Sequence, residues 1–150
     1  NARNLLRILK KYEGAIKFLP QATFKQETNA SSIGAIYFGS TEAAIQESLD
    51  KLSAFGHPVD AMRIRSFPFG SEVWDFIDQH DSLFVIEQNR DAQMKTLILA
   101  EGKNNPEKLI SILCFDGAPI TADFISTSIK DILSKDELSK TSEDLLWHTF

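Results

Sequence analysis

The sequence has one cysteine, no long hydrophobic run and no excess of positive charge, and each shortage excludes a class of protein. A single cysteine, Cys114, cannot form a disulfide framework or a thiolate metal cage, so the cytoplasm is the expected compartment. Ser111 interrupts one of the longest apolar runs, and no run approaches the roughly 18 residues of a membrane span. A net charge of −5 argues against a nucleic-acid-binding surface. We therefore expect neither a membrane nor a nucleic acid as partner.

The remaining composition is that of one folded domain, since 150 residues with 43% hydrophobic and 25% charged residues can bury a core. The chain begins at Asn1 without a signal peptide, and we expect it to be a piece of a larger protein. Its pattern predicts a linker helix over 1–20, an α/β domain over 21–133 and an acidic tail over 134–150.

Strand and helix signals alternate along the domain. Short apolar runs bounded by turn-forming residues predict four core strands, at Ile33–Phe38, Val59–Ile64, Ser82–Glu87 and about Leu109–Phe115. The polar stretch Ala22–Gln26 predicts an edge strand. Helical spacing predicts helices between the strands, over 42–55, 71–77, 92–100 and 122–133, with Ser71 and Thr121 as caps of the second and the last. The alternation indicates a mostly parallel sheet with helices on both faces.

The first helix, over 4–19, is amphipathic and basic. Its apolar positions, among them Leu5, Leu9, Tyr12 and Ile16, form one stripe, and Pro20 ends it. The stripe packs either on its own domain or on a neighbouring one.

The turn Gly39–Thr41 follows the first core strand, at the end of a parallel sheet where ligands bind. Backbone N–H groups of Gly39, Ser40 and Thr41 could cradle a phosphate, or the turn could simply cap the next helix. Glu42 in the first helical turn would repel an anion, which favours the capping interpretation.

The turn after the third core strand is dense in polar groups. Glu87, Gln88, Asn89 and Arg90 either satisfy the local backbone or contact another domain or a ligand. Arg63 and Arg65 lie on one side of a strand, where they could pair with surface carboxylates or face an acidic neighbour, and Phe67 and Phe69 follow in a loop. The interface candidates are Arg63, Arg65, Phe67, Phe69, Glu87, Gln88, Asn89 and Arg90.

The histidines and the cysteine offer no catalytic set. His57, His80 and His148 have no metal-ligand spacing, and we expect them at the surface. Cys114 lies in an apolar strand, where a buried thiol is favoured over a nucleophile. No catalytic residue and no metal ligand is predicted.

Four motifs taken in order carry a family resemblance: IGAIYFGSTE (33–42), VDAMRIRSFPF (59–69), VIEQNRDAQ (85–93) and FDGAPIT (115–121). Over about residues 1–133 they resemble the C-terminal domain of the alpha subunit of 2-oxoacid:ferredoxin oxidoreductases. The arginine-bearing second strand and the turn 87–91 look most like the 2-oxoglutarate type. The resemblance implies a transketolase C-terminal-like fold, a three-layer α/β/α domain whose five-stranded, mostly parallel sheet has one antiparallel edge strand.

The resemblance also implies a parent enzyme that oxidatively decarboxylates a 2-oxoacid to acyl-CoA with thiamine diphosphate, Mg²⁺, an iron–sulfur cluster and ferredoxin. The family's motifs for those cofactors do not occur in this chain, so it would hold no cofactor itself. It would be a non-catalytic, subunit-organising domain whose partners are the rest of the alpha subunit and the beta subunit. The alternative is a stand-alone α/β module that binds a phosphorylated small ligand at Gly39–Thr41.

Overall fold

A five-stranded sheet lies at the centre of the protein in a computed structural model that describes residues 2–26, 31–102 and 105–147, with 136–147 as backbone only. The strands are β1 (Thr23–Lys25), β2 (Ile33–Phe38), β3 (Asp60–Ile64), β4 (Ser82–Glu87) and β5 (Leu109–Leu113). Their order in the sheet is β1-β3-β2-β4-β5. All neighbours are parallel except β1, which runs antiparallel to β3. The predicted mostly parallel sheet with one antiparallel edge strand is confirmed.

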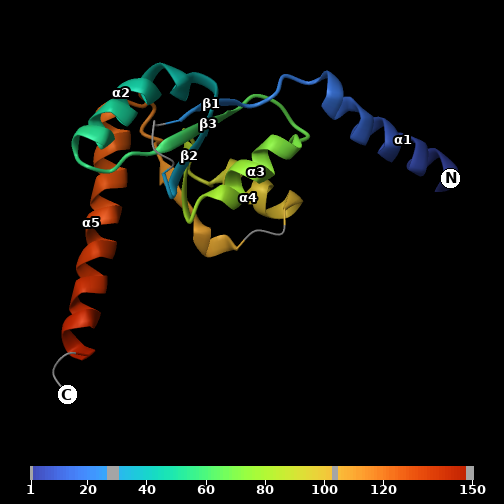
Figure 1. Cartoon of the computed structure of the whole chain (residues 1–150). Helices are drawn as coiled ribbons and strands as arrows, with labels where there is room; N and C mark the ends of the chain where they lie inside the picture. The colour runs from blue at the N-terminus through green and yellow to red at the C-terminus, as the bar shows by residue number, and fades with distance from the viewer. Residues whose placement is uncertain (1, 27–30, 103–104, 148–150) are drawn as a thin grey trace.

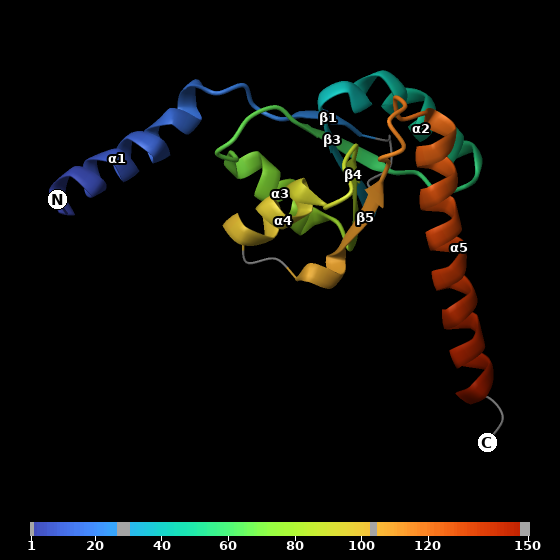
Figure 2. The same ribbon diagram turned by 180° about the vertical axis from the view of Figure 1, so that it is seen from behind.

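Helices cover both faces of the sheet (Figures 1 and 2). α2 (Glu42–Ala54) and α5 (Ala122–Trp147) lie on one face, and α3 (Ser71–Gln79) and α4 (Gln93–Glu101) lie on the other. Because side chains alternate along a strand, β2 sends Ala35 and Tyr37 into the first core and Ile36 into the second. Strands buried on both faces are typical of a parallel sheet between two helical layers, and the expected three-layer architecture is confirmed.

A missing side chain on β2 lets α3 approach the sheet closely. A Cβ atom on Gly34 would lie 2.6 Å from Cδ2 of Leu83 and 3.0 Å from both the Phe76 and His80 rings. Glycine at this position therefore permits the last turn of α3 and the residue after it to pack directly against the backbone of β2.

The first helix stands apart from the three layers. α1 (Ala2–Ala15) and a following 3₁₀ turn (Ile16–Phe18) project away from the sheet (Figure 1). α1 buries none of its residues, and Leu5 and Leu9 of its apolar stripe are 67% and 53% exposed. Its nearest aromatic contact is between Tyr12 and Phe67, whose ring centroids lie 6.2 Å apart. Packing of the stripe on its own domain, one of the two expectations, is therefore wrong.

Several predicted boundaries are corrected. The last helix does not end at Leu133 but continues to Trp147, because residues 134–147 contain neither proline nor glycine to stop it. Ser71 is the first residue of α3 and Gly70 holds the N-cap position. β5 ends at Leu113, two residues before the predicted end. The division into linker, domain and tail stays a prediction.

The predicted cap at Thr121 is confirmed, because its hydroxyl accepts a hydrogen bond from the Phe124 N–H at the start of α5. Asn105 caps a 3₁₀ turn (Pro106–Lys108) through its side chain. Within the described part of the chain, no helix is long and apolar enough to cross a membrane.

Candidate functional site

A buried carboxylate organises the carboxyl edge of the sheet. Glu87, the last residue of β4, is fully buried. Its Oε2 accepts hydrogen bonds from the Met94 N–H at 2.7 Å and from the Asn89 amide at 2.8 Å, and its Oε1 accepts from the Lys95 N–H at 3.0 Å. The backbone N–H groups of Met94 and Lys95 belong to the first turn of α4 (Gln93–Glu101). The first turn of a helix has unsatisfied hydrogen-bond donors and the positive end of the helix dipole. Glu87 therefore anchors α4 to the strand.

Asn89 completes the same turn. Its Oδ1 accepts from the backbone N–H groups of Asp91 at 3.1 Å and Gln93 at 3.3 Å. Ala92 between them adopts a left-handed conformation with φ of 49°. Asn89 thus uses its amide nitrogen on Glu87 and its amide oxygen on the backbone, which matches the local-backbone interpretation of this segment.

Gln88 joins three loops. Its Nε2 donates to Ser40 Oγ at 2.9 Å and to Thr41 Oγ1 at 3.2 Å, and its Oε1 accepts from the Ile120 N–H at 3.4 Å. One side chain therefore ties the end of β4 to the turn after β2 and to the loop before α5. Arg90 differs from its neighbours, since its side chain is 75% exposed and its ion pair is with the adjacent Asp91, at 2.7 Å.

The turn Gly39–Thr41 is a 3₁₀ turn in which Gly39 has a φ of +61°. It borders a shallow cavity of about 270 Å³ lined by Phe38, Gly39, Ser40, Thr41, Gln88, Asn89 and Gln93. Thr41 holds the N-cap position of α2, but its hydroxyl accepts from Gln88 and makes no capping hydrogen bond. The turn therefore supplies the N-cap residue of α2, as expected, but this residue makes no side-chain capping hydrogen bond.

A charged cluster lies beside this turn. The Tyr37 hydroxyl donates to Glu42 Oε2 at 2.7 Å, and Glu42 also pairs with Lys25 at 3.5 Å and Arg63 at 3.6 Å. The hydrogen bond from Tyr37, together with the two cations, holds the pKa of Glu42 below its ordinary value, while burial and Glu42 raise the pKa of Tyr37. Glu42 is thus an anion at neutral pH. The predicted pairing of Arg63 with a surface carboxylate is confirmed, while Arg65 is exposed.

The two candidate phenylalanines differ in accessibility. Phe67 is 41% exposed, whereas Phe69 is 6% exposed and packs edge-on against Phe67 and Trp74, with ring centroids 5.1 Å and 5.6 Å away. Phe67 can therefore contact another molecule directly, and Phe69 supports it from beneath.

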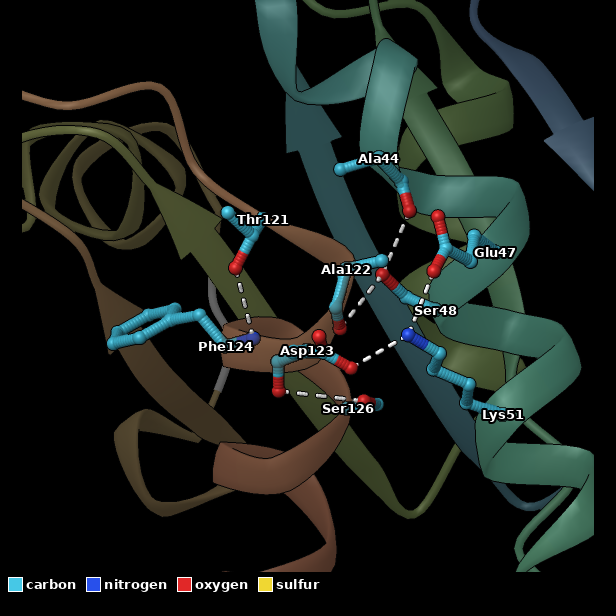
Figure 3. Close-up of polar contacts among 9 residues, drawn as sticks. All are labelled: Ala44, Glu47, Ser48, Lys51, Thr121, Ala122, Asp123, Phe124 and Ser126. Carbon is cyan, nitrogen blue, oxygen red and sulfur yellow. Dashed lines mark hydrogen bonds and ion pairs between the residues drawn. The ribbon is translucent and has the colours of Figure 1, made fainter.

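Sequence reasoning missed the polar joint between α2 and α5 (Figure 3). Lys51 of α2 binds Asp123 of α5 at 2.5 Å and Glu47 of its own helix at 2.6 Å. Ser48 is fully buried and donates to the carbonyls of Ala44, at 2.7 Å, and Ala122, at 3.4 Å. The i,i+4 spacing of Glu47 and Lys51 was visible in the sequence, but nothing there pairs them with a helix more than seventy residues away.

The histidine prediction is partly wrong. His80 is buried, at 2% exposure, His57 is half-buried, and His148 lies outside the described residues. Cys114 is buried as predicted, and burial together with Asp116 raises the pKa of its thiol, which disfavours the reactive thiolate. Within the residues that the structure describes, no group of histidine, cysteine, aspartate or glutamate could hold a metal ion.

The five-stranded sheet between two helical layers defines a three-layer α/β/α fold, and solved structures share this fold. No family model and no curated protein matches the chain. Over 87% of its length it is similar to the 2-oxoglutarate:ferredoxin oxidoreductase from Magnetococcus marinus, solved with 2-oxoglutarate, coenzyme A and succinyl-CoA bound, with a TM-score of 0.73 and 24% identity. It spans 23% of that chain.

Two further structures are similar over 76% of this chain. A split-gene transketolase, an inactive β4 tetramer, has a TM-score of 0.60 and 14% identity, and 41% of it is covered. The alpha chain of a probable 2-oxoacid ferredoxin oxidoreductase from Thermoplasma acidophilum has a TM-score of 0.46 and 26% identity, and 97% of it is covered. The similarity to the transketolase chain, together with the sheet topology, confirms the expected transketolase C-terminal-like fold.

Proposed function

We propose that this chain is the C-terminal domain of the alpha subunit of a 2-oxoacid:ferredoxin oxidoreductase, and that its role there is to organise subunits rather than to catalyse. The observation that carries the proposal is the similarity of the fold, over 87% of this chain, to a segment of the Magnetococcus marinus enzyme. The order of the four sequence motifs supports the same assignment. The substrate is a 2-oxoacid, 2-oxoglutarate by preference, and the enzyme works in the cytoplasm.

The non-catalytic role is supported by how the carboxyl edge is built. In a catalytic site at this edge, polar side chains would point toward a substrate. Here Glu87, Gln88 and Asn89 are bonded to backbone N–H groups and to neighbouring side chains. The parent's thiamine diphosphate, Mg²⁺, iron–sulfur cluster and coenzyme A are therefore assigned to its other domains and to the beta subunit.

The groups left for contact with partners lie at the rim of this edge. Arg90 is largely exposed, Phe67 is partly exposed, and Arg65 is exposed beyond the end of β3. Aromatic and arginine side chains of this kind are enriched at protein interfaces. The buried members of the predicted set, Glu87 and Phe69, would act by holding the rim in shape.

The alternative, a phosphorylated ligand at Gly39–Thr41, has less support. The hydroxyls of Ser40 and Thr41 already accept hydrogen bonds from Gln88, and the ionised Glu42 lies next to the turn. An anion held by the backbone N–H groups of this turn would have to overcome the repulsion from Glu42.

Two measurements test the proposal. Calorimetry of the 150-residue chain with thiamine diphosphate and Mg²⁺ should show no binding, and micromolar affinity would contradict the non-catalytic role. In the reassembled oxidoreductase, Arg90→Glu should weaken subunit association by about tenfold or more, as removal of an interface arginine typically does. Lys135→Glu, at an exposed position on α5 beyond the sheet, is the matched control and should leave association unchanged.

A further inference from the structure

The two edges of the sheet are built differently. β1, at one edge, is three residues long and carries a lysine, Lys25. β5, at the other edge, has the sequence LISIL, without a charged residue or a proline. An open edge can pair with a strand of another molecule, and proteins commonly prevent this with a short edge strand, a lysine or a proline. β1 has two of these protections and β5 has none.

The backbone groups on the outer side of β5 are in position to pair. The Cys114 N–H donates to the Glu87 carbonyl of β4 at 2.9 Å, so it points into the sheet. Because backbone groups alternate in direction along a strand, the N–H and C=O groups of Leu109, Ser111 and Leu113 point away from β4. Among the described residues no strand lies beyond β5, and no ladder uses these groups.

The side chains of β5 are also less covered than those of its neighbour. β4 buries every residue after Ser82, whereas Ile110, Ser111 and Leu113 of β5 are half-buried. Phe115, just past the strand, is 63% exposed. A further strand at this edge would therefore bury apolar surface as well as bond the outward backbone groups.

The sequence of this edge complements itself. LISIL reads the same in both directions about Ser111, so a two-fold axis there pairs two copies antiparallel, with Leu109 opposite Leu113. Lys108 precedes the strand and Asp116 follows it, and neither has an ion pair among the described residues. Antiparallel pairing brings Lys108 of one copy toward Asp116 of the other, so the charges at the two ends of the strand favour a second copy of this chain as the occupant.

We propose that β5 is a self-association edge, through which two copies of this chain join their β5 strands antiparallel about Ser111 and form one continuous sheet. Because the backbone of Ser111 points outward, its N–H and C=O groups bond those of Ser111 in the second copy. This edge is separate from the rim that holds Arg90 and Phe67, and the proposal does not rest on the proposed function. Its tests use the chain alone, so their failure leaves the proposed function untouched.

Amide exchange reads the pairing residue by residue in the unaltered protein. In a dimer joined through β5, the amides of Ser111 and Leu113 are hydrogen-bonded. We expect NMR of the full 150-residue chain to show them exchanging at least about tenfold more slowly than unbonded amides. The Ile112 amide, which points toward β4, is the reference and is protected in monomer and dimer alike. Exchange of the Ser111 and Leu113 amides at the rate of unbonded amides overturns the proposal.

Sedimentation velocity of variants places the interface. Ser111→Lys sets two like charges opposite each other across the two-fold axis and should weaken dimerisation by about tenfold or more. Ser53→Lys, the matched control, makes the same change at an exposed position of α2 and should leave dimerisation unchanged. The proposal is overturned by a monomeric wild type, by an undiminished dimer of Ser111→Lys, or by a dimer that is lost in Leu9→Arg on α1 instead. The exchange measurement stands even where Ser111→Lys fails to fold.

Discussion

α1 and α2 are helices of nearly equal length, 14 and 13 residues, and both have an apolar face, yet they differ in what covers that face. α2 places its apolar residues between β2 and α5 and buries Ala44, Ile45, Ser48, Leu49 and Leu52. α1 buries none of its residues and projects from the domain (Figures 1 and 2). The spacing of apolar residues thus specifies a helix with an apolar face. Most of the stability of that helix comes from the tertiary packing that buries this face.

α4 is a third case. It buries Ile98 and packs Met94, Leu97 and Leu99 partly against the second core, and its first turn is in addition fixed by the carboxylate of Glu87. α2 is therefore secured by an apolar face, α4 by an apolar face together with a buried carboxylate, and α1 by neither. Substitutions that remove one kind of anchor at a time should separate them.

The largest expected loss of stability is at a buried leucine of α2, compared with an exposed leucine of α1. Leu52→Ala in α2 removes a fully buried side chain and should lower the free energy of unfolding by about 2–5 kcal/mol. Leu9→Ala in α1, at a position 53% exposed, should change it by less than about 0.5 kcal/mol. Urea unfolding of the two variants measures both. Equal losses would mean that α1 has a covering surface in solution, and the contrast between the helices would disappear.

A smaller loss of stability is expected when the Glu87 carboxylate that anchors α4 is removed. Glu87→Gln replaces an acceptor of two backbone N–H groups by a side chain that must turn one donor toward donors, and should cost about 1–3 kcal/mol. Arg90→Gln, three residues on and exposed, is the control and should be neutral within about 0.5 kcal/mol. Thermal melting and amide exchange of α4 report the difference. Unchanged α4 protection in Glu87→Gln would show that the helix does not depend on this anchor.

The smallest effect is expected at the surface joint of α2 with α5. Lys51→Met removes the ion pairs with Glu47 and Asp123, whose side chains are 66% and 84% exposed, and should reduce stability less than either buried substitution. The hydrogen bonds that Lys51 donates to Asp123 and Glu47 raise its pKa above 10.5, so its contribution is complete below that pH and is lost only as pH rises through the higher folded-state value.

Melting temperatures measured in low salt and in 1 M NaCl test this joint. The difference between Lys51→Met and the wild type should be visible in low salt, constant from pH 6 to pH 9, and abolished in high salt. A loss that persists in 1 M NaCl would assign the role of Lys51 to packing of its aliphatic chain.

Local sequence signals predicted the elements well for a physical reason. β2 and β4 have the predicted bounds, and α2 lies within one residue of its predicted range, because period and turn chemistry act over only a few residues. The same signals overlooked the continuation of α5 past Leu133, since polarity was taken as the end of the helix although no residue there interrupts it.

The sequence predicted where the polar residues of the candidate site lie, but not which groups they contact. The density of polar groups at 87–90 marked a real network, but the sequence left open whether its partners were internal or external. Gln88 bonds to Ser40 and to the Ile120 N–H, positions 48 and 32 residues away, which no local pattern relates. Their role at an interface stays a prediction.

The sequence alone determined where the chain is helical or extended and which side chains seek a core, because backbone propensity and the period of apolar residues are properties of neighbouring residues. Only the tertiary structure decided which polar groups are satisfied and which apolar face stays uncovered. His80 meets Asp60 because strand register places Asp60 of β3 beside Gly34, whose missing side chain leaves room for the His80 ring. The stripe of α1 meets no such surface among the described residues. Desolvation and hydrogen bonding depend on what the fold places opposite a group, and that is settled only once the sheet has formed.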